Sequence, residues 1–145
     1  DLWIPSHPTD EDRRRVELAI SFVATLCVEK MKLSHDSRIE LGIAGQSFDR
    51  WEGRSGPKAI ESLLELLAMA NAGAETEWPR LREMAAQRPS SVTRAVMVTT
   101  RDADRMSDDF ARIWGMTEEG GADVLRDVTA IAADERSLAK IFTLE

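Results

Sequence analysis

The stretch AVMVTTRDAD, residues 95–104, decides the fold class that we expect for this chain. Four apolar residues run without interruption and then stop at two threonines and a charged segment. Continuous apolar runs are typical of strands that are covered on both faces in α/β proteins. The stretch DLWIPS, residues 1–6, likewise has an apolar run that stops at small polar residues. Parallel strands end at a shared sheet edge where ligands bind, so the two stretches predict a sheet and a candidate site at its edge.

The length and composition predict a single domain over residues 1–145. A chain of 145 residues, 43% hydrophobic and 31% charged, is large enough to bury a core without disulfides. The net charge of -7 disfavours a nucleic-acid partner. Cys27, the single cysteine, lies among apolar helical neighbours and is expected to pack as a small hydrophobe, which suits a reducing compartment.

Two features of the chain bear on its cellular setting. No apolar run approaches the ~20 residues that cross a bilayer, so we expect no membrane insertion by this segment. The chain starts with Asp1 directly before an apolar run, and we expect it to be a fragment of a longer protein.

Apolar periodicity and turn residues predict an alternation of helices and strands. Helices are expected over residues 10–32, from Pro57 to about residue 71, over 76–87, after Ser107 and after Asp134. Strands are expected at residues 39–43, 95–98 and 128–133, with a short edge strand near 46–51. This order predicts a mostly parallel sheet with helices on both faces. An all-helical bundle is the alternative.

Polar residues follow the predicted strands at the edge where ligands bind. The residues that would form an oxygen-rich cluster at this edge are Asp1, Thr99, Thr100, Asp102 and Asp104. Oxygen ligands are those that magnesium and calcium take. The alternative, which we favour at this stage, is that these short side chains cap the strands and the helices after them.

Motifs for nucleophilic or nucleotide chemistry are not supported by the sequence. His7 and His35 fall in predicted loops, away from the strand ends that would hold them beside a nucleophile. The segment GRSGPK, residues 53–58, lacks the glycine spacing of a phosphate loop, and Pro57 removes a backbone donor. No glycine-rich dinucleotide motif follows any predicted strand, and the lysine of a phosphoacceptor receiver domain is missing.

Three stretches carry a resemblance to a known family. They are DLWIPSHPTDEDRRRVELAISFVATLCVEKM (1–31), TRAVMVTTRDAD (93–104) and SLAKIFTLE (137–145). In order and spacing the chain resembles the von Willebrand factor A-like domain of the bacterial domain-of-unknown-function 58 family. The resemblance implies a three-layer αβα sandwich with a mostly parallel sheet of von Willebrand factor A-like, Rossmann-like topology.

The resemblance also implies a position for a metal-ion-dependent adhesion site. Such a site uses Asp-x-Ser-x-Ser after the first strand, a threonine from a loop before a middle helix and an aspartate after the fourth strand. On this chain the first motif falls on Asp1, Trp3 and Pro5, so that the aspartate remains and both serines are lost. Ser55 is the stand-in for the loop threonine, and the late aspartate falls on Thr100.

These departures predict a degenerate site without metal or other cofactor. Trp3 and Pro5 offer no side-chain oxygen, and Arg101 adds positive charge beside the expected position of the ion. Asp102 or Asp104 could substitute for the missing aspartate if the strand register differs by two residues. Magnesium therefore remains the alternative.

The expected function is a non-enzymatic protein–protein interaction module. Trp3 and Arg101 are the partner-binding candidates because interface centres favour aromatic residues and arginine. The role that we favour for Trp3 itself is a hydrophobic plug that fills the space left by the ion. The resemblance implies a cytoplasmic domain of a membrane-anchored bacterial protein that works with a MoxR-type AAA ATPase. A magnesium-dependent ligand-binding domain and a small α/β enzyme are the alternatives.

Overall fold

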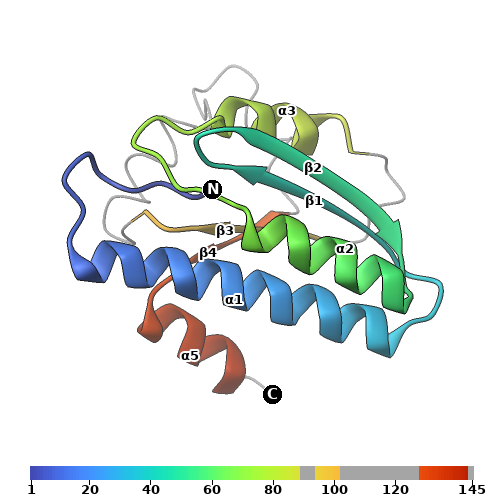
Figure 1. The fold of residues 1–145 in the computed structure, drawn as a ribbon. Helices are drawn as coiled ribbons and strands as arrows, with labels where there is room; N and C mark the ends of the chain where they lie inside the picture. Colours follow the sequence, from blue (N-terminus) through green and yellow to red (C-terminus); the bar gives the residue numbers. More distant parts are fainter. Residues whose placement is uncertain (89–93, 102–127, 144–145) are drawn as a thin grey trace, which may run out of the picture.

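The computed structural model describes residues 1–88, 94–101 and 128–143 and shows a mixed α/β architecture (Figure 1). The helices are α1 (Asp10–Leu33), α2 (Pro57–Ala68), α3 (Trp78–Ala86) and α5 (Glu135–Thr143). The strands are β1 (Arg38–Ala44), β2 (Phe48–Arg54), β3 (Ala95–Thr99) and β4 (Val128–Ala132). The helix expected after Ser107 lies outside the described residues.

The strands form two separate pairs, which differ in direction. β1 and β2 are antiparallel, with Arg38 opposite Arg54 and Ala44 opposite Phe48. β3 and β4 are parallel, with Ala95 opposite Val128. Residues 45–47 join β1 to β2, and a connection this short allows only an antiparallel hairpin, because a parallel crossover needs a dozen residues or more.

The expected three-layer αβα sandwich around one mostly parallel, von Willebrand factor A-like sheet is therefore wrong. The described strands make two two-stranded sheets, one of them antiparallel. The apolar run at Leu2–Ile4, which was expected to be the first strand of the sheet, makes a single isolated β-bridge, between Trp3 and Gly73. Pro5 follows directly, and because proline has no backbone N–H it cannot continue a ladder. The expected all-helical alternative is excluded by the strand pairs.

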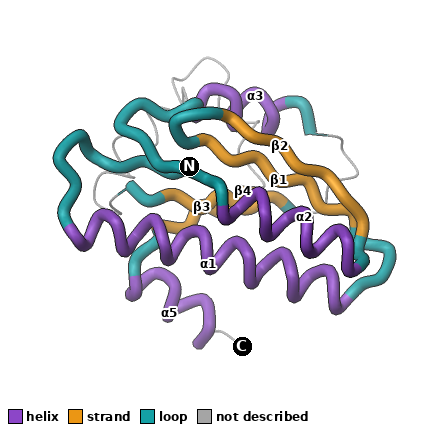
Figure 2. Tube along the Cα trace, viewed as in Figure 1, coloured by secondary structure: helices purple, strands orange, loops and turns teal. Residues whose placement is uncertain are grey.

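The N-terminal segment, residues 1–4, lies between the two sheets (Figures 1 and 2). On one side the Asp1 nitrogen donates to the Val98 carbonyl at 2.8 Å, and the Thr100 N–H donates to the Asp1 carbonyl at 3.1 Å. On the other side the Leu2 N–H donates to the Ala44 carbonyl at 2.8 Å, and Ile4 donates to Gly73 at 3.1 Å. Alternate residues of this extended segment thus tie the end of β3 to the end of β1.

Helices cover both faces of the β1–β2 hairpin. One face contributes Ile43, with Ile39 and Leu41 beside it, to the apolar core that also contains α1 and α2 residues. The opposite face is covered by α3, since a Cβ placed on Gly42 would lie 2.7 Å from side-chain atoms of Leu81. Figure 2 shows α1 and α2 on one side of the strands and α3 on the other. The buried residues of the apolar core are Leu2, Ala19, Phe22, Cys27, Met31, Ile43, Leu63, Leu67, Val98, Ala133 and Leu138.

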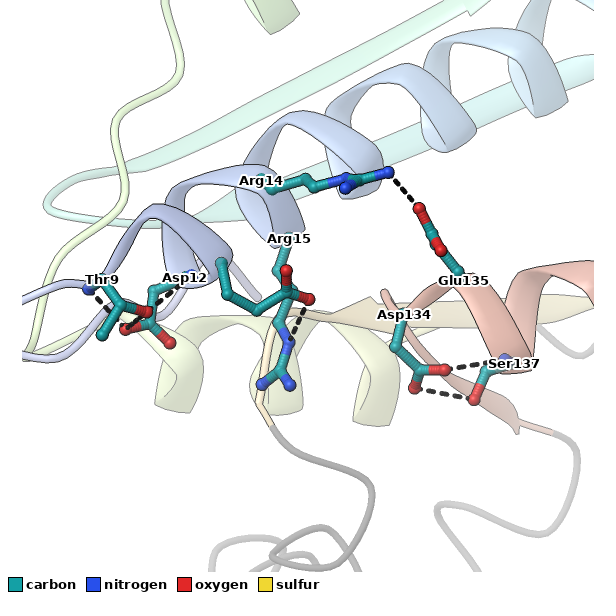
Figure 3. Close-up of polar contacts among 8 residues, drawn as sticks. Thr9, Asp12, Arg14, Arg15, Asp134, Glu135 and Ser137 are labelled. Carbon is teal, nitrogen blue, oxygen red and sulfur yellow. Dashed lines mark hydrogen bonds and ion pairs between the residues drawn. The ribbon is translucent and has the colours of Figure 1, made fainter.

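The helix boundaries follow from local chemistry that the sequence displays. Thr9 caps α1 in a capping box, in which its Oγ1 accepts from the Asp12 N–H at 3.2 Å and its own N–H donates to the Asp12 carboxylate at 2.8 Å. Asp134 caps α5 by accepting from the Ser137 N–H at 2.8 Å. Figure 3 shows both caps and the Arg14–Glu135 ion pair that joins α1 to α5. Pro57 begins α2 as expected, but this helix ends at Ala68, earlier than the expected end near residue 71.

None of the helices in the described part of the chain combines the length and the apolar character that a bilayer span requires.

We predict that Gly45→Ala destabilises the protein far more than Gly42→Ala. A Cβ on Gly45 would lie 1.9 Å from the Asn71 carbonyl oxygen, which is backbone, whereas a Cβ on Gly42 would meet the flexible ends of Leu81 and Met84. We expect a loss of about 3 kcal/mol in unfolding free energy for Gly45→Ala and about 1 kcal/mol for Gly42→Ala, measured by urea denaturation. Equal losses would contradict this packing of the residue-71 loop against the hairpin.

We predict that the Cys27 thiol is unreactive in the folded protein. Cys27 lies buried in the core, and burial raises the pKa of its thiol to about 11. At pH 8 the thiolate fraction is then roughly a hundredfold smaller than for a cysteine of ordinary pKa. Alkylation by iodoacetamide at pH 8 should therefore be slow in the native protein and fast in urea. Equal rates in the two states would show that Cys27 is accessible.

Candidate functional site

The candidate site lies where the N-terminal segment meets the end of β3. Thr99 is the last residue of β3, and Thr100 and Arg101 follow it. The backbone hydrogen bonds of Asp1 to Val98 and Thr100 bring its side chain to this strand end. We call the following set the Asp1 cluster: Asp1, Trp3, Thr76, Thr99, Thr100 and Arg101.

The Asp1 carboxylate is the centre of the cluster and accepts three hydrogen bonds. Oδ1 accepts from Thr76 Oγ1 at 2.8 Å. Oδ2 accepts from Thr99 Oγ1 at 2.9 Å and from Arg101 Nε at 2.8 Å. The Asp1 side chain is only 6% exposed and that of Arg101 18%, so the ion pair is shielded from water. A shielded carboxylate of this kind is stable only while its hydrogen-bond donors stay in place.

The two threonines after the apolar run of β3 are buried and fully used. Thr99 is 1% exposed, and its hydroxyl both donates to Asp1 and accepts from the Arg101 N–H at 3.2 Å. Thr100 is 3% exposed, and its hydroxyl donates to the Trp3 carbonyl. Buried polar groups that find partners in this way add rigidity to their surroundings. The threonine pair therefore locks the N-terminal segment onto β3.

Trp3 and Arg101 form a stacked pair at the border of the cluster. The Arg101 guanidinium carbon lies 5.4 Å from the centroid of the Trp3 ring, which is a cation–π distance. The same guanidinium bonds Asp1 through Nε, so one side chain joins the buried carboxylate to the indole. Trp3 is partly exposed, and the pair extends from the buried interior to the protein surface.

The structure brings together five of the residues that the sequence singled out. Bonds and ring contacts described above connect Asp1, Trp3, Thr99, Thr100 and Arg101. Pro5 follows the last paired residue of the N-terminal segment and is partly exposed. Asp102 and Asp104, which were possible substitutes for a metal ligand, lie outside the described residues.

Ser55 is not part of the cluster. Its hydroxyl donates to the Ser34 carbonyl at 3.2 Å and to the His35 carbonyl, where the chain leaves α1. Ser55 follows the end of β2 that pairs with Arg38, whereas Leu2 bonds the opposite end of β1 at Ala44. Six steps along a strand separate these ends by about 20 Å. Ser55 therefore fixes the turn before α2 and does not stand in for a site threonine.

Thr76 was missed from the sequence, although it is the threonine that reaches Asp1. It lies in the loop before α3, two residues before the helix begins. Its position in a loop before a middle helix could have identified it, because the family resemblance implies a site threonine in such a loop. Ser55 was matched to that threonine by position alone. Its contact with Asp1 spans 75 residues of sequence and leaves no local pattern.

The cluster offers little to a cation. Both Asp1 oxygens accept hydrogen bonds from protein donors, and one of these donors is a guanidinium that would repel an ion. Within residues 1–88, 94–101 and 128–143, no three histidine, cysteine, aspartate or glutamate side chains gather as a metal site would require. The arrangement holds the Asp1–Arg101 ion pair in a shielded position and places the Trp3 indole beside it.

No protein family, curated protein or solved structure matches this chain.

We predict strong energetic coupling between Asp1 and Arg101. Asp1→Asn and Arg101→Gln should each lower the unfolding free energy by about 2 kcal/mol, because each leaves a shielded charge without its partner. The double variant should lose about 1–2 kcal/mol less than the sum of the two single variants, as determined from urea denaturation.

The exposed ion pair between Arg13 and Asp10 supplies the matched control for this cycle. Both of its side chains are more than half exposed, and the two residues lie three positions apart on α1. Arg13→Gln should change stability by less than about 0.5 kcal/mol. A coupling energy near zero for Asp1 and Arg101, or one equal to that of the control pair, would contradict the structural role assigned to the cluster.

Proposed function

We propose that this chain is a non-catalytic protein-interaction domain whose contact surface includes the Trp3–Arg101 pair and needs no metal. The observation that carries the proposal is the bonding of Asp1. Its carboxylate, which a metal site would use, is held by Thr76, Thr99 and Arg101. A carboxylate satisfied by internal donors serves structure and leaves the neighbouring surface to make contacts without an ion.

The chemistry of the pair supports a protein partner. Trp3 is partly exposed, and the stacked Arg101 is fixed by its bond to Asp1. Tryptophan and arginine are the residues most enriched at the energetic centres of protein interfaces. A pair held in place before binding loses less side-chain entropy when a partner docks.

The proposed partner comes from the sequence resemblance. We propose a MoxR-type AAA ATPase as the partner and the cytoplasmic side of a membrane-anchored bacterial protein as the setting. The acidic net charge of -7 makes a protein surface a more suitable partner than nucleic acid.

Pull-down of the chain with a MoxR-type ATPase encoded by a neighbouring gene, in the presence of ATP, tests this function. Trp3→Ala should weaken the interaction at least about tenfold, as expected for loss of an interface centre. The control is Leu33→Ala, which truncates a side chain that is 82% exposed at the end of α1 and should leave binding unchanged. Circular dichroism must show that Trp3→Ala remains folded. Failure of the unmodified chain to bind the ATPase would refute the proposed partner.

We also predict that magnesium does not stabilise the protein. A cation that binds the folded state raises the melting temperature as its concentration exceeds its dissociation constant. Because the Asp1 oxygens are occupied by Thr76, Thr99 and Arg101, addition of about 10 mM MgCl₂ should leave the melting temperature unchanged, apart from the ionic-strength effect that NaCl reproduces. A specific rise that Asp1→Ala abolishes would favour a magnesium-dependent ligand-binding domain instead.

A further inference from the structure

A second feature of the surface is a shallow hollow between β2 and α3. Its volume is about 230 Å³. The lining residues are Phe48, Arg50, Arg80, Glu83, Met84 and Gln87. It shares no residue with the Asp1 cluster. Its lining combines two apolar side chains, Phe48 and Met84, with two arginines, a glutamate and a glutamine, and this combination sets the ligand chemistry that it can accept.

Arg80 is the cation of the hollow whose donors are unused. Its guanidinium carbon lies 5.5 Å from the centroid of the Phe48 ring. In the part of the chain that the structure describes, the Arg80 side chain makes no hydrogen bond or ion pair with an acceptor. A guanidinium has five N–H donors in a planar fork that matches a carboxylate. The ring fixes the position of the cation and leaves this fork available.

The other two charged residues of the hollow make contacts of their own, although the negative charge of Glu83 is not neutralised by its contact. Arg50 forms an ion pair with Glu40 on the neighbouring strand β1. Glu83 accepts a hydrogen bond from Gln87 at 3.3 Å, one turn later on α3. The uncompensated donor capacity therefore belongs to Arg80, and an anion is the group that would complete it.

Two apolar side chains, Phe48 and Met84, are among those that line the hollow. Phe48 and Met84 are both partly buried. α3 packs directly on the hairpin at Gly42, where an added Cβ would lie 2.7 Å from Met84 Sδ and 3.4 Å from Phe48. Methionine and phenylalanine favour an apolar group beside the anion. A ligand that joins a carboxylate to an apolar side chain fits better than an inorganic anion.

We propose that this hollow is a docking site for an acidic segment of a protein partner, with a glutamate or aspartate carboxylate on Arg80 and an adjacent apolar side chain on Phe48 and Met84. The proposal rests on the proposed function as a protein-interaction domain and gives that domain a second contact surface.

The test is residue-resolved NMR titration of the ¹⁵N-labelled chain with the blocked peptide acetyl-Gly-Leu-Glu-Leu-Gly-amide. Saturable shifts are expected at the amides of Phe48, Arg80 and Met84. Arg80→Gln should weaken binding roughly tenfold, as loss of a charge-assisted hydrogen bond implies. Arg82→Gln, which removes an arginine of the same helix outside the hollow, is the matched control and should change binding less than about twofold.

A second variant keeps the test decisive if Arg80→Gln alters the fold. Glu83→Gln removes a like charge from the lining and should strengthen peptide binding about twofold. The proposal is overturned if no shifts occur, if the peptide with glutamine in place of glutamate binds equally well, or if free glutamate binds as tightly as the peptide. It is also overturned if Arg82→Gln weakens binding as much as Arg80→Gln.

The two proposals fail separately. Loss of ATPase binding in Trp3→Ala with intact peptide shifts would leave both standing. Intact ATPase binding without any peptide shifts would remove the hollow alone. Peptide shifts at the hollow without ATPase binding would remove the partner proposed above and retain a carboxylate-binding surface.

Discussion

The hydrogen bonds of the N-terminal segment are the constraint on which the arrangement of the two sheets depends. Residues 1–4 bond the end of β3 through Asp1 and the end of β1 through Leu2. The four strands do not form one continuous ladder, so these few backbone bonds, with the helices packed on either side, keep the sheets together. The Asp1 carboxylate strengthens this connection because it accepts hydrogen bonds from Thr99 in β3, from Arg101 two residues after that strand and from Thr76 in the loop before α3.

This constraint explains why the end of β3 carries the Asp1–Arg101 ion pair at the position where a magnesium ion was the alternative expectation. Arg101 supplies within the chain the positive charge that an ion would otherwise bring to Asp1. Such an arrangement does not depend on ion concentration, and its geometry is fixed by covalent connection. The stacked indole of Trp3 then has a stable position from which to contact another molecule.

The sequence predicted the local elements well and the pairing of the strands poorly. Helix α1, the Asp134 cap and the strand runs at 39–43 and 95–98 follow from side-chain periodicity and from short-range hydrogen bonds. Strand partners depend on contacts between distant parts of the chain, and no local pattern records them. Asp1 and Thr100 could be proposed from their places beside predicted strands, and Trp3 and Arg101 from the family resemblance. Thr76 was missed and Ser55 was assigned to the wrong end of the hairpin, because their contacts join distant parts of the chain.

Because the chain is synthesised from its N-terminal side, the bonds between Asp1 and β3 can form only late in synthesis. Asp1 is made nearly one hundred residues before Val98, Thr99 and Arg101, to which it bonds. Loops of this size close slowly because closure costs chain entropy before any contact rewards it. Helix α1 and the β1–β2 hairpin can form while synthesis continues, but the aspartate must wait. Leu2 and Ile4 can bond Ala44 and Gly73 earlier, so residues 1–4 are joined to the hairpin side alone until β3 has been made.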